Sequence, residues 1–142
     1  MTVKAILSSK GRDVVAIEPA ANLAAAAKLL AERRIGAVLV LADGRLAGIL
    51  SERDIVRALA ERGSAALADR VDRMMTRKVI TCSESDTVAQ IMEQMTAGKF
   101  RHVPVVDDGR VVGVVSIGDV VKRRLEQIES ESNALREYIL TA

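Results

Sequence analysis

The chain has 142 residues, of which 49% are hydrophobic and 28% charged, and its formal net charge is +2. This length and balance are typical of one folded domain with a sizeable core and exclude a disordered chain. No apolar run approaches the roughly 20 residues that cross a bilayer, and the N-terminus lacks the long apolar core of a signal peptide. We therefore expect a cytoplasmic protein without a membrane partner.

The composition also argues against catalysis and against nucleic-acid binding. Cys82 is the only cysteine and His102 the only histidine, so the sequence offers no multi-cysteine metal site and no nucleophile next to a suitable base. Acidic and basic residues are interleaved, and Phe100 and Tyr138 are the only aromatic residues, which leaves no basic stripe and no stacking platform. We expect no enzyme activity, no metal, no catalytic cofactor and no nucleic-acid partner.

Apolar spacing and turn residues predict the elements of the first half. They are a helix over 3–10, a strand over 13–17, a helix after Asn22, strands over 35–41 and 46–50, a helix from Ser51 to about Gly63, and a short connecting helix within 64–76. Asn22 is a favoured N-cap residue, and Leu23, Ala26 and Leu30 follow it at the spacing of one buried helix face. Asp43-Gly44 between apolar runs predicts a hairpin.

The second half repeats the first. Shifting the sequence by 65 residues places Arg34–Asp54 on Lys99–Asp119 without a gap. The corresponding elements are a strand over 79–82, which would bury Cys82 as an inert thiol, a helix with Val88, Ile91, Met92 and Met95 on one face, strands over 103–106 and 111–115 around Asp108-Gly109, and a helix after Ser116. Each half is thus β-α-β-β-α, which predicts an α+β fold of two repeats related by a pseudo-two-fold axis and sharing one core.

The last helix is longer than one repeat requires. Its apolar residues continue through Val121, Leu125 and Ile128 and as far as Leu135 and Ile139. An unused apolar face is most simply covered by a second copy of the chain, so we expect a homodimer. The expected organisation of the single module 1–142 is repeat 1 over 13–63, a connecting segment over 64–77, repeat 2 over 78–128 and a helical extension over 129–142.

The paired hairpins resemble a known module. VLVLADGRLAGILSERD and VPVVDDGRVVGVVSIGD each end in Gly-h-h-Ser-x-x-Asp, with h apolar, and are similar to tandem CBS (cystathionine β-synthase) domains, the Bateman module. The segments Arg101–Val105, Asp72–Thr76, Lys10-Gly11 and Tyr138-Ile139 also match the short stand-alone CBS-pair proteins of bacteria and plant organelles. The resemblance implies a non-catalytic sensor that binds an adenine nucleotide between its repeats and reports the bound state to a partner.

The resemblance implies AMP as the ligand, with ADP, ATP or NAD(H) as alternatives. Asp54 and Asp119 are the candidate ribose ligands, because a carboxylate can accept hydrogen bonds from both ribose hydroxyls. The full set of candidate binding residues adds Ser51, Ser116, Arg53, Arg101, His102 and Lys10 for phosphate or ribose, and Ile80 and Pro104 for adenine. A capping box is the structural alternative for each Ser-x-x-Asp, and the two roles are partly compatible.

The two sites are not expected to be equivalent. Arg101 and His102 precede the second hairpin, whereas Gly36 and Ala37 occupy the corresponding positions of the first. Two other functions remain open at this point: an adaptor whose sites are vestigial, and a nucleic-acid-binding CBS protein. Similar plant proteins point to thioredoxin-type partners for the sensor.

Overall fold

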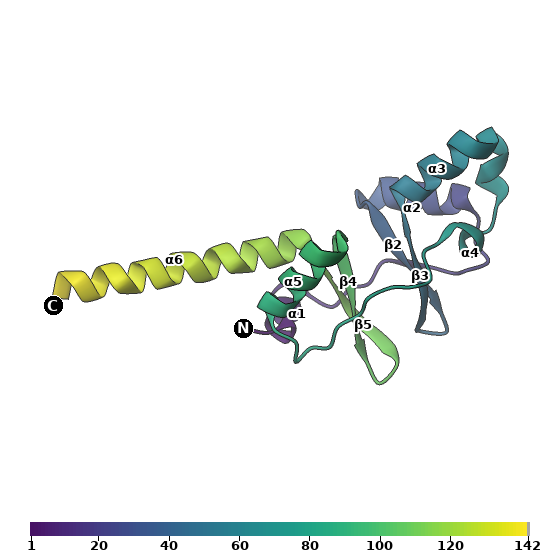
Figure 1. The fold of residues 1–142 in the computed structure, drawn as a ribbon. Coiled ribbons are helices and arrows are strands. Elements are labelled where there is room, and N and C mark those ends of the chain that lie inside the picture. The colour runs from purple at the N-terminus through teal and green to yellow at the C-terminus, as the bar shows by residue number, and fades with distance from the viewer. Residues whose placement is uncertain (142) are drawn as a thin grey trace.

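The structure is a computed structural model that describes residues 1–141, and two similar halves and a projecting C-terminal helix are visible in it (Figure 1). The first half contains α1 (Val3–Lys10), β1 (Ala16–Ile17), α2 (Leu23–Arg33), β2 (Ala37–Ala42), β3 (Arg45–Ser51), α3 (Glu52–Arg62), the 3₁₀ helix η1 (Gly63–Ala68) and α4 (Val71–Met74). The second contains α5 (Val88–Gly98), β4 (His102–Asp107), β5 (Arg110–Ser116) and α6 (Ile117–Thr141). The α+β class expected from the sequence is confirmed.

Local sequence signals determine where several elements begin and turn. The side chain of Asn22 accepts a hydrogen bond of 2.9 Å from the backbone nitrogen of Ala25 and caps α2. At the first hairpin Asp43 and Gly44 have φ angles of 53° and 78°. Two consecutive left-handed residues are the requirement of a type I′ turn, whose twist matches that of the flanking strands. The second hairpin repeats this turn.

The two sheets differ by one strand. In the first half β1 runs parallel to β2, which pairs antiparallel with β3, whereas the second sheet contains only β4 and β5. The prediction of a strand over 79–82 is therefore wrong, because a single parallel bridge from Cys82 to Val105 is all that forms there. The reason is Pro104, which stands at the position of Leu39. The Leu39 nitrogen donates to the Val15 oxygen, while proline has no N–H to donate.

Each half has its own hydrophobic core, so the prediction of one shared core is also wrong. In the first core Leu23 of α2, Leu50 of β3 and Val71 of α4 are buried together. In the second core Leu7 of α1 packs with repeat 2 residues such as Val103. Helix α1 contributes residues to the second core and α4 to the first, so each sheet is covered by its own set of helices. The contact between the hairpin tips is polar, with Arg110 donating to the Asp43 carbonyl oxygen at 3.2 Å.

A repeated glycine lets the connecting segments approach the sheets closely. A Cβ atom on Gly48 would lie 2.7 Å from both the Met75 sulfur and the Thr76 oxygen. A Cβ atom on the equivalent Gly113 would lie 2.7 Å from the Leu7 side chain. These distances are too short for any side chain, so glycine at both positions allows α1 and the segment after α4 to pack against the sheets.

The helix α6 begins against the second half and then leaves it. Its first turns pack on α5, β5 and α1, and the remainder extends away from the two repeats (Figure 1). Within residues 1–141 none of the helices has the length and apolar character needed to cross a bilayer.

Candidate functional site

A cavity of about 610 Å³ lies between the two repeats. Repeat 1 contributes the beginning of β2, the end of β3 and the first turn of α3, while repeat 2 contributes the segment from the end of α5 to β4. The lining residues used below are Ser51, Glu52, Arg53, Asp54, Thr76, Lys78, Ile80, Lys99, Phe100, Arg101 and His102. The volume is in the range of small-molecule sites in proteins.

Asp54 is held at the edge of this cavity by a capping box. Its Oδ2 atom accepts hydrogen bonds from the Ser51 nitrogen at 2.9 Å and from the Ser51 hydroxyl at 3.1 Å. The Ser51 oxygen in turn accepts from the Asp54 nitrogen at 3.2 Å. The capping box considered at the sequence level is thus present, and it fixes the carboxylate relative to the backbone.

The cap leaves one carboxylate oxygen of Asp54 available. The nearest cation to Oδ1 is Nη1 of Arg57, at 3.8 Å, which is beyond normal hydrogen-bond distance. Asp54 as a whole is only 9% exposed. A buried carboxylate with an unused oxygen is a strong acceptor for a hydroxyl donor that enters the cavity.

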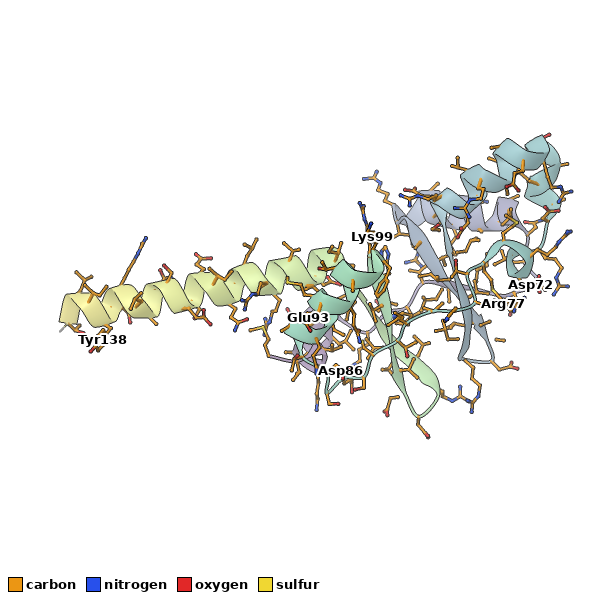
Figure 2. The ribbon with its side chains drawn as sticks, in the orientation of Figure 1. Asp72, Arg77, Asp86, Glu93, Lys99 and Tyr138 are labelled. Atoms are coloured by element: carbon orange, nitrogen blue, oxygen red, sulfur yellow. The ribbon has the colours of Figure 1, made fainter. Side chains whose placement is uncertain are left out.

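Four basic residues surround the cavity without a carboxylate partner. Arg53, Lys78, Lys99 and Arg101 take part in no side-chain hydrogen bond or ion pair within residues 1–141. Lys99 lies where α5 ends, on the side of repeat 2 that faces repeat 1 (Figure 2). Since Glu52 and Asp54 are the only acidic residues in the lining, the cavity favours an anionic group near the start of α3.

His102 is half-buried at the boundary between the cavity and the second helix start. Burial lowers the pKa of its imidazole, the nearby cations Lys10 and Arg101 lower it further, and Asp119 opposes them. The net effect lowers the pKa from its ordinary value of 6.5, so the ring is neutral at pH 7. His102 can therefore exchange hydrogen bonds with a ligand but does not add a positive charge.

The second Ser-x-x-Asp unit has a different environment. Asp119 Oδ2 accepts from the Ser116 nitrogen at 2.9 Å, as in the first repeat, but it also accepts from Lys10 Nζ at 2.6 Å. Lys10 Nζ donates a further hydrogen bond of 2.8 Å to the Val114 oxygen. Burial alone would raise the pKa of Asp119, but the hydrogen bonds from Lys10 and Ser116 outweigh it and lower the pKa.

Six of the ten candidate binding residues thus line the cavity between the repeats, and four do not. The cavity is lined by Ser51, Arg53, Asp54, Ile80, Arg101 and His102, while Lys10, Pro104, Ser116 and Asp119 are absent from its lining. Pro104 is buried within β4. Lys10, a candidate phosphate or ribose ligand, is paired with the carboxylate of Asp119.

Sequence reasoning missed several lining residues. Phe100 and Lys99 directly precede Arg101, so the cluster could have been extended by two residues. Thr76 and Lys78 lie in the connecting segment, which reaches the cavity because the backbone groups of Thr76 and Ile49 exchange hydrogen bonds of 2.8 and 2.9 Å. No local signal in the sequence indicates that pairing.

Cys82 has no role in the cavity. Its side chain is buried, and burial together with Asp86 raises the pKa of the thiol to about 12. The thiol is therefore protonated and unreactive at neutral pH.

The profile of the CBS domain matches the chain twice, over residues 3–61 and 71–126. The chain belongs to the CBS domain family. The two matches cover both Ser-x-x-Asp units and both hairpins, so the duplication seen in the sequence is a pair of CBS domains. The resemblance drawn from the hairpin motifs is confirmed.

Three comparisons illustrate the similarity. The chain is 35% identical over 119 residues to "CBS domain-containing protein CBSX3, mitochondrial" of Arabidopsis thaliana, covering 80% of this chain but only 58% of that protein. The crystal structure of the CBS-domain containing protein ATU1752 from Agrobacterium tumefaciens has a TM-score of 0.82 and 49% identity, over 87% of this chain and 92% of that one. The structure of the CBS domain protein PAE2072 from Pyrobaculum aerophilum complexed with AMP has a TM-score of 0.74 and 32% identity, over 84% of this chain and 89% of that one.

The lowered pKa of His102 predicts a dependence of stability on pH. Below pH 6.5 the unfolded chain takes up a proton at this residue before the folded chain does, so the free energy of unfolding falls as pH decreases through this range. Urea unfolding of the wild type and of His102→Gln from about pH 7.5 to about pH 5.5 measures this. The free energy of unfolding of the wild type minus that of the variant should decrease towards low pH. A difference that stays constant or increases would contradict the lowered pKa of His102.

Proposed function

We propose that the chain is a non-catalytic sensor that binds an adenine nucleotide in the cavity between its CBS repeats, with AMP the favoured ligand. The observation that carries the proposal is that one cavity combines a buried carboxylate with an oxygen that the cap does not use, a helix start and four basic residues without an ion-pair partner within residues 1–141. A nucleoside monophosphate needs one acceptor for ribose hydroxyls and one cationic region for phosphate. The AMP complex of PAE2072 supports this choice of ligand.

Asp54 is the proposed ribose ligand. The capping box occupies Oδ2, and Oδ1 remains available to accept from a ribose hydroxyl. The start of α3 lies beside it and supplies the positive end of the helix dipole. The carboxylate is thus oriented before the ligand arrives, which lowers the entropy lost on binding.

The phosphate and the base are assigned to different residues of the lining. Arg101 and Arg53, with Lys78 or Lys99, are the proposed phosphate ligands because they have no other anionic partner within residues 1–141. Ile80 is 47% exposed and gives the adenine an apolar surface. ADP, ATP and NAD(H) are the alternative ligands, which would extend further past the same cations.

We also propose that only the Asp54 cavity binds nucleotide in the resting protein. Lys10 already neutralises the charge of the Asp119 carboxylate through its hydrogen bond to Oδ2, so Asp119 is a weaker acceptor for a ribose hydroxyl than Asp54. This accounts physically for the expected inequivalence of the two sites. The regulated partner is a further part of the proposal, with a thioredoxin-type protein as the candidate and a homodimer as the assembly.

The ribose role of Asp54 predicts a specific loss of affinity. Asp54→Asn keeps an acceptor for the helix cap but removes the charge, so AMP affinity measured by calorimetry should fall roughly 10- to 100-fold. Asp119→Asn is the matched control, because this residue occupies the equivalent cap but is already paired with Lys10. Unchanged affinity in Asp54→Asn, or an equal loss in both variants, would count against the assignment.

The blocking role of Lys10 predicts a change in stoichiometry. Wild-type protein should bind about one AMP per chain, and Lys10→Ala should free Asp119 and raise the number towards two. Lys4→Ala, which removes an exposed lysine from the same helix, is the control and should leave the stoichiometry unchanged. Two ligands per wild-type chain would show that Lys10 does not block the second site, and no binding of AMP or its alternatives would refute the proposed function itself.

A further inference from the structure

The part of α6 that leaves the repeats carries a regular apolar stripe. Its members alternate at spacings of four and three residues: Val121, Leu125, Ile128, Ser132, Leu135 and Ile139. The five apolar residues among them are 43%, 61%, 48%, 59% and 65% exposed. Alternating spacings of four and three residues repeat every seven residues, which is the heptad pattern of a coiled coil, and we call these six residues the seam.

Most of the seam has no partner among the described residues 1–141. Val120, one residue before it begins, is buried against repeat 2, but every described residue from Glu129 onwards is exposed. Tyr138 lies near the far end of α6, well away from both repeats (Figure 2). The exposed end of this helix over 129–141 is short enough to be only marginally stable alone in water, so an apolar stripe along it indicates a partner helix.

The charges beside the seam identify that partner. Arg124 and Glu131 lie on one flank, immediately before Leu125 and Ser132, and Glu129 and Arg136 lie on the other flank, immediately after Ile128 and Leu135. In a parallel, in-register pair each residue of the first flank faces the residue five positions later on the other copy. Arg124 then faces Glu129, and Glu131 faces Arg136.

An antiparallel pair would place like charges together. With the seams fully overlapped in opposite directions, Glu129 faces Glu129, Glu131 faces Glu131 and Lys122 faces Arg136. None of these residues takes part in an ion pair within residues 1–141. The sequence of charges is therefore self-complementary in the parallel arrangement only.

We propose that the seam of α6 forms a parallel, in-register, two-stranded coiled coil with a second copy of the chain. The proposal gives the homodimer an orientation: the paired tails lie along the two-fold axis, and both CBS pairs, with their Asp54 cavities, are at the same end. It does not depend on nucleotide binding. Ser132 is a small polar residue within the seam, where it leaves one weakly packed layer between Ile128 and Leu135.

Two serines provide a matched test in the full-length chain. Ser132 lies in the seam and Ser130 lies on the opposite, outward face of the helix, and both are exposed. Equivalent seam residues of a parallel pair come close enough for a disulfide. In a glutathione redox buffer, Ser132→Cys should form covalent dimers about tenfold more readily than Ser130→Cys, because pairing raises the effective thiol concentration at the seam. Wild-type protein is the blank, since Cys82 is buried and unreactive.

Charge exchange in the Ser132→Cys chain then tests the orientation. In a parallel pair Arg136→Glu places two glutamates together and lowers cross-linking, and adding Glu131→Arg restores it. In an antiparallel pair Arg136→Glu would instead face Lys122 and raise cross-linking, which would overturn the parallel arrangement. Equal cross-linking at 130 and 132, or none at either, would overturn the proposed coiled coil. This holds even if light scattering finds a dimer, because such a dimer would be formed by another part of the chain.

Discussion

The arrangement of the site depends on one local interaction, the hydrogen bonds between a serine and an aspartate three residues later at a helix start. At Ser51 and Asp54 this interaction ends β3, begins α3 and fixes the carboxylate against the backbone. A short-range cap thereby sets the position of the residue that is proposed to hold the ligand. The same groups serve stability and binding, because the cap uses one carboxylate oxygen and leaves the other available.

Duplication of this unit gives a nearly symmetric pair, and one lysine breaks the symmetry. The N-terminal helix α1 packs into the core of repeat 2, which brings Lys10 to the carboxylate of Asp119. Among the described residues, the nearest cation to Asp54 is Arg57, which is 3.8 Å from Oδ1 and beyond hydrogen-bond distance. Two equivalent motifs can thus have different ligand-binding properties although the motif residues themselves are the same.

Local signals in the sequence were sufficient for most of the fold. The Asp-Gly turns, the Asn22 cap and the Ser-x-x-Asp units predicted hairpins and helix starts that the structure contains. The two errors, a strand over 79–82 and a single shared core, concern interactions between distant segments. Pro104 lacks the N–H group that Leu39 donates to Val15, and this difference matters only once the pairing of the strands is known. Helix α1 joins a core whose other residues lie more than 70 positions later in the sequence.

In the candidate site, too, local motifs indicate some of the lining residues, whereas contacts between distant segments bring in others. The sequence indicated Ser51, Asp54 and Arg101 because they belong to recognisable motifs. Thr76 and Lys78 reach the cavity through a backbone pairing with β3 that no sequence motif predicts. Lys10, a candidate phosphate or ribose ligand from the sequence, forms an ion pair with Asp119 in the structure. The sequence does not indicate this pair, because Lys10 and Asp119 are 109 positions apart and meet only in the folded chain.

The most direct test of the account is a crystal structure of the full-length protein grown with AMP. We expect electron density for one nucleotide per chain in the cavity between the repeats, with a ribose hydroxyl within hydrogen-bond distance of Asp54 Oδ1, the phosphate near Arg101 and the Lys10–Asp119 pair intact. Nucleotide bound only beside Asp119, with Lys10 displaced and the Asp54 cavity empty, would contradict it.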